Sequence, residues 1–160
     1  MRLIACFAIL IFISSCETTR ISEQNIDLDN SVWPVDSLVK FSFSVKHSDV
    51  YKISMNLRNS GNYGFQNIYI GYWLKDSLEQ VILTNTVELK NIDNFQLFDP
   101  KTGTPLGRGL GDIFEHRFVL EDSLKLESGK TYSMEFQHYM RDQNLKGVLS
   151  IGYRLDQIEK

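Results

Sequence analysis

The sequence predicts an all-β protein, a single-domain antiparallel β-sandwich of the immunoglobulin-like or jelly-roll-like kind. Three observations predict it. Apolar and polar residues alternate with period two in most segments after Trp33, as in strands that bury one face. Turn-forming residues separate these segments at an even spacing, which is typical of sandwiches with about seven to nine short strands. No segment combines the apolar period of an amphipathic helix with helix caps.

The strand-like segments follow one another from residue 38 to near the end of the chain. In order, they are Leu38–Val45, Tyr51–Arg58, Phe65–Leu74, Val81–Leu83 with Thr86–Leu89 (one long strand or two short ones), Phe95–Phe98, Ile113–Leu120, Thr131–Met140 and Leu145–Leu155. The first is the clearest, because its four apolar residues at odd positions share one face. A turn at His47-Ser48-Asp49 follows it. We therefore expect the first two segments to form a hairpin or to lie as neighbouring strands.

Composition limits the classes of function that the chain can serve. Its 160 residues, 42% of them hydrophobic with only 10 Gly and 3 Pro, are enough for one domain with a proper core. The formal net charge is −3 and no basic stripe is visible, so we expect no nucleic-acid partner. Both cysteines, Cys6 and Cys16, lie in the first sixteen residues. The body of the chain therefore has no disulfide, thiol nucleophile or cysteine-based zinc site.

The other residues that bear chemistry form no recognisable constellation. The three histidines, His47, His116 and His138, are not at a spacing typical of metal ligands. No pair of carboxylates and no Ser-His-Asp arrangement stands out. We therefore expect no metal, no cofactor, no small-molecule substrate and no enzymatic activity.

The N-terminus has the pattern of an export signal. Arg2 is followed by an apolar run of eleven residues from Leu3 to Ile13, which is too short to span a membrane and fits the core of a signal peptide. Ile13-Ser14-Ser15-Cys16 then resembles the lipobox of bacterial lipoproteins, in which the cysteine thiol receives a diacylglycerol and becomes the first residue. We expect a signal peptide over residues 1–15, a flexible tether of about 20 Å over residues 16–31 and a sandwich over residues 32–160.

A cluster of four glycines invites a phosphate-binding interpretation. Gly103, Gly107, Gly109 and Gly111 lie close together, but no Lys-Ser/Thr pair and no helix follow them, as a phosphate-binding loop requires. We expect these glycines to supply positive φ angles in turns and bulges.

Aromatic residues leave a carbohydrate-binding function open as the alternative. Tyr63, Tyr69, Tyr72 and Trp73 lie close together in the chain. They fit a stacking surface for sugar rings, in a lipid-anchored sandwich of a surface glycan system, or packing in the core of the sandwich.

Three pieces of the body resemble the gliding-motility lipoprotein family GldH of the Bacteroidetes. The pieces are Leu57-Arg58-Asn59 with Tyr63, Phe65, Asn67 and Ile68; Leu106-Gly107-Arg108-Gly109-Leu110-Gly111-Asp112-Ile113; and Met140-Arg141 with Leu145, Gly147, Val148, Ile151 and Gly152. Their order, together with the lipobox and the length, carries the resemblance from about Trp33 to the last predicted strand.

The resemblance implies a non-enzymatic role in gliding on surfaces and in the associated type IX secretion machinery. It implies an acylated Cys16, and hence a membrane as one partner, with other gliding or secretion proteins of the envelope as further partners. The protein would be lipid-anchored and would face the periplasm from the inner or the outer membrane. Polar residues that match family positions are either partner contacts or turn-capping and cross-strand pairs. They are Arg58, Asn59, Arg108, Asp112 and Arg141.

Overall fold

The computed structural model describes residues 20–86 and 92–158, which form strands and one short 3-10 turn. The elements, in chain order, are β1 (Arg20–Asp27), η1 (Asp29–Ser31), β2 (Val32–Pro34), β3 (Val39–Ser44), β4 (Asp49–Ser60), β5 (Asn67–Lys75), β6 (Val81–Thr84), β7 (Asp93–Gln96), β8 (Arg108–Leu110), β9 (Ile113–Leu126), β10 (Thr131–His138), β11 (Asn144–Lys146) and β12 (Val148–Gln157). The expected signal peptide and Cys16 lie outside the described residues, as does most of the expected strand Thr86–Leu89.

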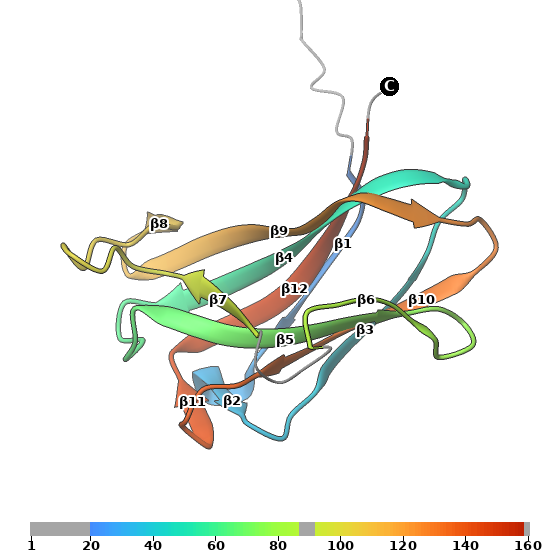
Figure 1. Cartoon of the computed structure of the whole chain (residues 1–160). Coiled ribbons are helices and arrows are strands. Elements are labelled where there is room, and N and C mark those ends of the chain that lie inside the picture. Colours follow the sequence, from blue (N-terminus) through green and yellow to red (C-terminus); the bar gives the residue numbers. More distant parts are fainter. Residues whose placement is uncertain (1–19, 87–91, 159–160) are drawn as a thin grey trace, which may run out of the picture.

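Two antiparallel sheets pack face to face (Figure 1). One sheet has the strand order β1-β12-β4-β9-β8, and the other has the order β3-β10-β5-β6, with β7 also paired to β5. A small ribbon of β2 and β11 lies at one end of the sandwich. The prediction of an all-β antiparallel sandwich in one domain is therefore confirmed.

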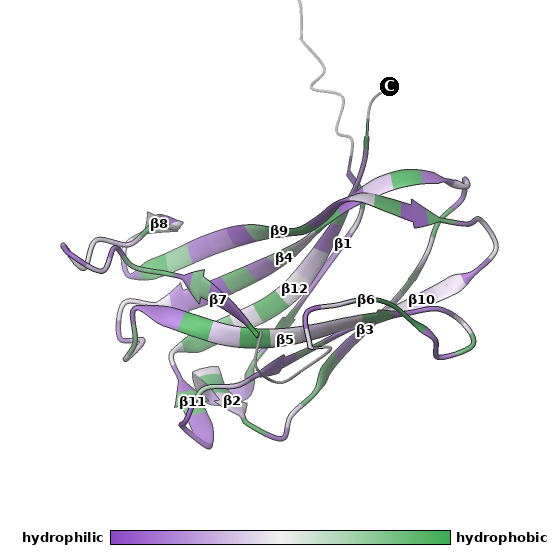
Figure 2. Cartoon of the chain, in the orientation of Figure 1, coloured by the Kyte–Doolittle hydropathy of each residue, from purple (hydrophilic) through white to green (hydrophobic). Residues whose placement is uncertain are grey.

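The core follows from the period-two pattern of the strands. Residues of β3 are alternately buried and exposed along the whole strand, and Figure 2 shows apolar and polar residues alternating along several of the longer strands. From the opposite sheet, the ring of Tyr153 stacks on Phe43 with 4.9 Å between ring centroids, and meets Phe41 edge-on at 5.4 Å. Aromatic rings from the two sheets thus pack in the edge-on and stacked geometries that aromatic pairs prefer.

The predicted pairing of the first two strand-like segments is wrong. β3 pairs with β10 in one sheet, whereas β4 lies between β12 and β9 in the other. The turn after Val45 therefore carries the chain across the core, and the hydroxyl of Tyr51 fixes it by donating to the carbonyl of His47 at 2.7 Å. Both strands bury their apolar faces against the same core from opposite sides, so their alternation alone does not distinguish this crossing from a hairpin.

The expected flexible tether over residues 16–31 differs from the structure in its second part. Residues Arg20–Asp27 form β1, which pairs with β12 from Arg20 opposite Asp156 to Asp27 opposite Ser150. A polar segment is able to form an edge strand because backbone hydrogen bonds and outward ion pairs, rather than apolar burial, hold it in place. Three residues, 17–19, lie between Cys16 and the first residue of β1.

The predicted last strand is also divided. Gly147 has a φ of +87° and separates β11 from β12. Its N–H donates to the carbonyl of Ser31 at 2.9 Å, and its carbonyl accepts from the N–H of Ser60 at the same distance. This residue needs the left-handed conformation that glycine adopts without strain, so the chain breaks there into two strands.

Candidate functional site

Arginines gather on the outer face of the five-stranded sheet. The chain has seven arginines, and Arg2 lies outside the described residues. Of the remaining six, all except Arg141 lie on this one face. We call Arg20, Arg58, Arg108, Arg117 and Arg154 the arginine face. They come from five different strands, and the outward positions of the pleat bring them together.

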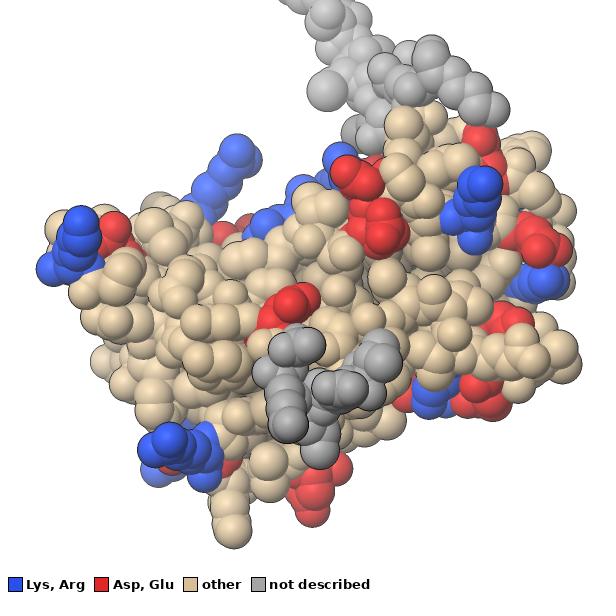
Figure 3. Space-filling model, in the orientation of Figure 1, with Lys and Arg blue, Asp and Glu red and all other residues tan. Residues whose placement is uncertain are grey.

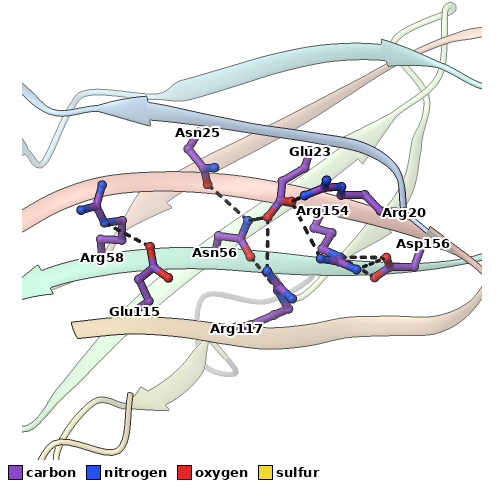
Figure 4. Close-up of polar contacts among 9 residues, drawn as sticks. All are labelled: Arg20, Glu23, Asn25, Asn56, Arg58, Glu115, Arg117, Arg154 and Asp156. Carbon is purple, nitrogen blue, oxygen red and sulfur yellow. Dashed lines mark hydrogen bonds and ion pairs between the residues drawn. The ribbon is translucent and has the colours of Figure 1, made fainter. Parts of the chain in front are cut away.

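One carboxylate organises one end of the arginine face (Figure 4). Glu23 accepts hydrogen bonds from Arg20 at 2.8 Å, from the amide of Asn56 at 2.7 Å and from Arg117 at 3.2 Å. Arg154 lies 3.9 Å away and makes its closest contacts with Asp156. Partial burial alone would raise the pKa of Glu23, but these hydrogen bonds and positive charges hold that pKa below its usual value. Glu23 is thus ionised and fixed in place at neutral pH.

The other end of the face is more open. Arg58 contacts Glu115 across the β4–β9 pair, with 3.4 Å between Nε and Oε1, and both side chains are substantially exposed to solvent. Arg108 lies directly opposite Glu115 in the β8–β9 register. Arg58, Arg108 and Arg117 line a hollow of about 680 Å³. The other residues that line it are Asn25, Asn56, Leu57, Gln96, Leu106, Gly107, Glu115, His116 and Phe118. At this end Arg58 pairs with the exposed Glu115, while Arg108 and Arg117 also line the hollow.

Gly152 leaves room for the side chain of Asn25 on the arginine face. A Cβ at this position would meet Oδ1 of Asn25 and the carbonyl oxygen of Gln24. The side chain of Asn25 therefore lies over β12 and accepts a hydrogen bond from the amide of Asn56 at 3.2 Å. Asn56 uses its own carbonyl oxygen to accept from Arg117 at 3.0 Å. The glycine thus lets β1, β4 and β9 share one hydrogen-bonded network.

The glycine-rich segment forms the edge strand β8 and the turn into β9. Gly111 has a φ of +67° in that turn, and Gly103 has a φ of +70° before the strand, as expected from the sequence. Gly107 and Gly109 have a different role. A Cβ on Gly107 would meet the carbonyl of Glu115 and the ring of His116, and one on Gly109 would meet Phe114. These two glycines allow β8 to approach β9 closely.

The predicted site residues divide between this face and other places. Arg58 and Arg108 lie on either side of Glu115. Asp112 is exposed in the turn between β8 and β9, and its carbonyl accepts from the N–H of Gly61 at 2.7 Å. Arg141 is exposed in the loop between β10 and β11, away from the others in the sheet order. Cys16 lies outside the described residues.

Asn59 is buried and belongs to the core of the fold. Its amide nitrogen donates to the carbonyl of Ser60 at 3.0 Å, and its Oδ1 lies 3.0 Å from Nε2 of His116. This residue is in a buried cross-strand pair, which was one of the two interpretations that the sequence left open. Burial lowers the pKa of His116, which keeps the imidazole neutral.

Sequence reasoning missed Glu23, Asn56, Arg117 and Arg154. Each stands at an outward position of its strand, where a polar residue is ordinary. Only the register of four strands shows that they meet, since they are up to 131 residues apart in the chain.

The four aromatic residues considered for carbohydrate binding do not form one surface. Tyr63 and Tyr72 are buried, and the hydroxyl of Tyr63 donates to the carbonyl of Asn67 at 3.0 Å. Burial raises the pKa of Tyr72 to about 12. Only Tyr69 and Trp73 remain at outward positions of β5. Two of the four residues are thus part of the core.

The described residues lack two other kinds of feature. No three His, Cys, Asp or Glu side chains in residues 20–86 and 92–158 are arranged to hold a metal ion. The same ranges contain no helix with the length and apolar character needed to cross a membrane. On the side of the molecule seen in Figure 3, acidic and basic side chains are interspersed and form no continuous basic stripe.

Comparison with known proteins places this fold in a family. The GldH lipoprotein family profile matches residues 20–155, from the first residue of β1 into β12. A gliding motility lipoprotein GldH homolog from Christiangramia forsetii is 27% identical over 158 residues, which cover 94% of this chain and 91% of the relative. The resemblance seen in the sequence is therefore confirmed, and the chain belongs to the GldH lipoprotein family.

Proposed function

We propose that this chain is a lipid-anchored, non-catalytic component of the machinery for gliding on surfaces and for its associated type IX secretion. One observation carries the proposal. The family match begins at Arg20, where β1 also begins, and Cys16 of the lipobox-like tetrapeptide lies just four residues earlier. A folded family domain thus follows directly after a site suited to lipid attachment.

The chemistry of the anchor fits this arrangement. A thioether from Cys16 to a diacylglycerol supplies two acyl chains, and two chains anchor a protein stably where one does not. The four steps along the backbone from Cys16 to Arg20 span at most about 14 Å. The sandwich would therefore lie close to the membrane, facing the periplasm from the inner or the outer membrane, after removal of residues 1–15.

Anchoring supports a role in assembly rather than turnover. Confinement near a membrane raises the effective concentration of the domain toward other envelope proteins, so modest interfaces are sufficient. The arginine face is the surface of the domain through which we expect such an interface to form.

The proposal is tested by deleting the gene in a gliding host and complementing the deletion with three forms of the protein. The wild-type chain and Cys6→Ala should restore colony spreading and single-cell movement, because Cys6 lies in the segment expected to be removed. Cys16→Ala should leave the protein out of the membrane fraction and should not restore movement. Unchanged movement and unchanged adhesin export in the deletion strain would contradict the proposed function.

A further inference from the structure

The hollow beside Arg58 and Arg108 borders an unpaired strand edge. β9 pairs with β4 along its length, but on its other side β8 covers only Ile113 to Glu115. In the described part of the chain, no strand pairs with this side of β9 beyond Glu115. Figure 1 shows β9 continuing past the short β8 with no strand beside it. An open edge of this kind offers backbone N–H and C=O groups to another extended chain.

The open stretch has a defined end. The register between β4 and β9 shifts between Val119 and Glu121, and the Glu121 carboxylate accepts from the N–H groups of Asp122 and Ser123, at 3.0 Å each. A bulge of this kind locally disrupts the regular ladder of a strand. The regular part of the free edge is therefore residues 116–119, of which 116–118 line the hollow.

The two sides of this edge differ in chemistry. On the outer side Arg58, Arg108 and Arg117 line the hollow, and Arg58 pairs there with Glu115. On the inner side the hollow is lined by Phe118 and Leu106, of which Leu106 is 56% exposed. A strand added here would place alternate side chains against arginines and against apolar groups. Arginine forks pair best with carboxylates and other planar or tetrahedral anions.

We infer that the open edge of β9 and the arginine face bind an extended protein segment in which acidic and apolar residues alternate, added to the sheet as a strand in line with β8. This inference deepens the proposed function, on which it rests, because it gives the chemistry of the envelope partner. It corresponds to recognition by strand addition, in which backbone bonds supply affinity and alternate side chains supply specificity.

A protein segment fits this place better than a bilayer surface does. The hollow is lined by Asn25 and not by Arg20, and these two positions are separated by about 17 Å along β1. The proposed lipid anchor would hold the Arg20 end near the membrane. Phosphate headgroups would also leave the backbone groups of residues 116–119 unpaired.

The test uses the full lipidated chain purified in a neutral detergent. The probe is a fluorescent peptide of about ten residues in which glutamate and valine alternate, and its binding is measured by anisotropy. Two comparison peptides have the same composition with glutamate and valine in separate blocks, or lysine in place of glutamate. Vesicles of phosphatidylglycerol, which carry anionic phosphate headgroups, test whether the arginines bind a membrane surface instead of a peptide.

We expect saturable binding of the alternating acidic peptide and much weaker binding of the comparison peptides. Arg108→Glu should weaken that binding about tenfold or more, because one attraction becomes a repulsion. Arg141→Glu is the matched control, since this exposed arginine lies away from the face, and it should change binding little. Hydrogen exchange of the amides at residues 116–119 should slow when the peptide is bound.

Three results would overturn the inference. They are the absence of saturable peptide binding, equal loss of binding in Arg108→Glu and Arg141→Glu, and Arg108-dependent binding of the vesicles but not of the peptide. Arg58→Glu provides a second variant if Arg108→Glu disturbs β8, and thermal unfolding of each variant shows whether it is folded. Because the peptide measurement does not involve motility, its failure leaves the proposed function standing, and normal gliding in the deletion strain leaves the peptide result standing.

Discussion

The imidazole Nε2 of His116 in β9 lies 3.0 Å from Oδ1 of Asn59 in the neighbouring strand β4. The amide nitrogen of Asn59 already donates to a backbone carbonyl, so its oxygen accepts and Nε2 of the histidine donates. This arrangement requires a proton on Nε2, and burial lowers the pKa of His116 so that the ring as a whole is neutral. The pair links the polar edge of the hollow to the core.

Stability should fall as the pH is lowered through the range of histidine titration. Burial lowers the pKa of His116 and of His138 from the ordinary value of 6.5. Below that pH the unfolded chain binds protons at these positions and the folded chain does not, so the free energy of unfolding decreases with falling pH. Urea unfolding between pH 7.5 and pH 5 measures this slope.

Variants assign the pH effect to particular rings. His116→Gln should make the dependence of stability on pH shallower, whereas His47→Gln, at an exposed position in the β3–β4 turn, should leave it as it is. Glu23 and Glu135 have pKa values held below 4.5, so their contribution is lost in a separate and more acidic range. Stability that stays constant down to pH 5 would contradict the buried neutral imidazoles.

Gly152→Ala should destabilise the domain by about 1–3 kcal/mol, the usual cost of inserting a methyl group into a filled site. The new Cβ would displace Asn25 and press on the backbone of β1. Gly64→Ala is the control, since nothing lies within 4 Å of a Cβ built there, and it should change stability by less than about 0.5 kcal/mol. Chemical denaturation of the two variants decides the comparison. If Gly152→Ala were as stable as Gly64→Ala, β1 would be free to shift away from β12.

Lys75→Met should cost about 1–3 kcal/mol, because it removes a charged hydrogen bond from a buried carboxylate. Nζ of Lys75 lies 2.6 Å from Glu135, whose side chain is 4% exposed, and Lys40 reaches the other oxygen of Glu135 at 3.0 Å. Lys130→Met is the matched control. Its ion pair with the exposed Glu127 should contribute much less to stability, because solvent screens exposed pairs. The same loss in both variants, measured by urea unfolding, would contradict this distinction.

Tyr153 should show separate contributions from its hydroxyl and from its ring. Tyr153→Phe removes the 2.7 Å hydrogen bond with Ser22 and should cost about 1 kcal/mol. Tyr153→Ala also removes the ring packed against Phe41 and Phe43 and should cost about 3–5 kcal/mol. Tyr69→Phe, at a half-exposed position, is the control and should be nearly neutral. Thermal unfolding of the three variants tests this order, and a Tyr153→Ala chain as stable as Tyr153→Phe would contradict it.

The alternation of side chains was sufficient to predict most of the strands of the two sheets and the faces that they bury. It gave β3, β5 and β10 with nearly correct bounds, because each of them buries a continuous apolar face. It did not give the partner of each strand, since β3 and β4 present similar faces to one core from opposite sheets. It also missed β1, whose pairing depends on backbone bonds and on Glu23 and Asn25 rather than on apolar residues.

The candidate site was predictable only in part. Arg58 and Arg108 were identified through their match to the family, and the structure places both beside Glu115. Nothing local in the sequence links Arg117 or Arg154 to them, because the face depends on the register of strands that are far apart in the chain. The role of Asn59 likewise depends on its burial. Burial of this residue could not be predicted, because a polar residue in a turn-like segment is ordinarily exposed.

The pairing of β1 with β12 has a mechanical consequence if Cys16 carries the proposed anchor. Seven residue pairs join the two strands, and a pull from the membrane would act on the N-terminal end of β1, along its axis. Hydrogen bonds in an antiparallel ladder lie across the strands, so tension between the anchor and a partner held at β9 would load the ladder in shear. The hydrogen bonds between β1 and β12 would then bear the load together instead of breaking one after another. The domain would therefore transmit force without β1 first separating from the sheet.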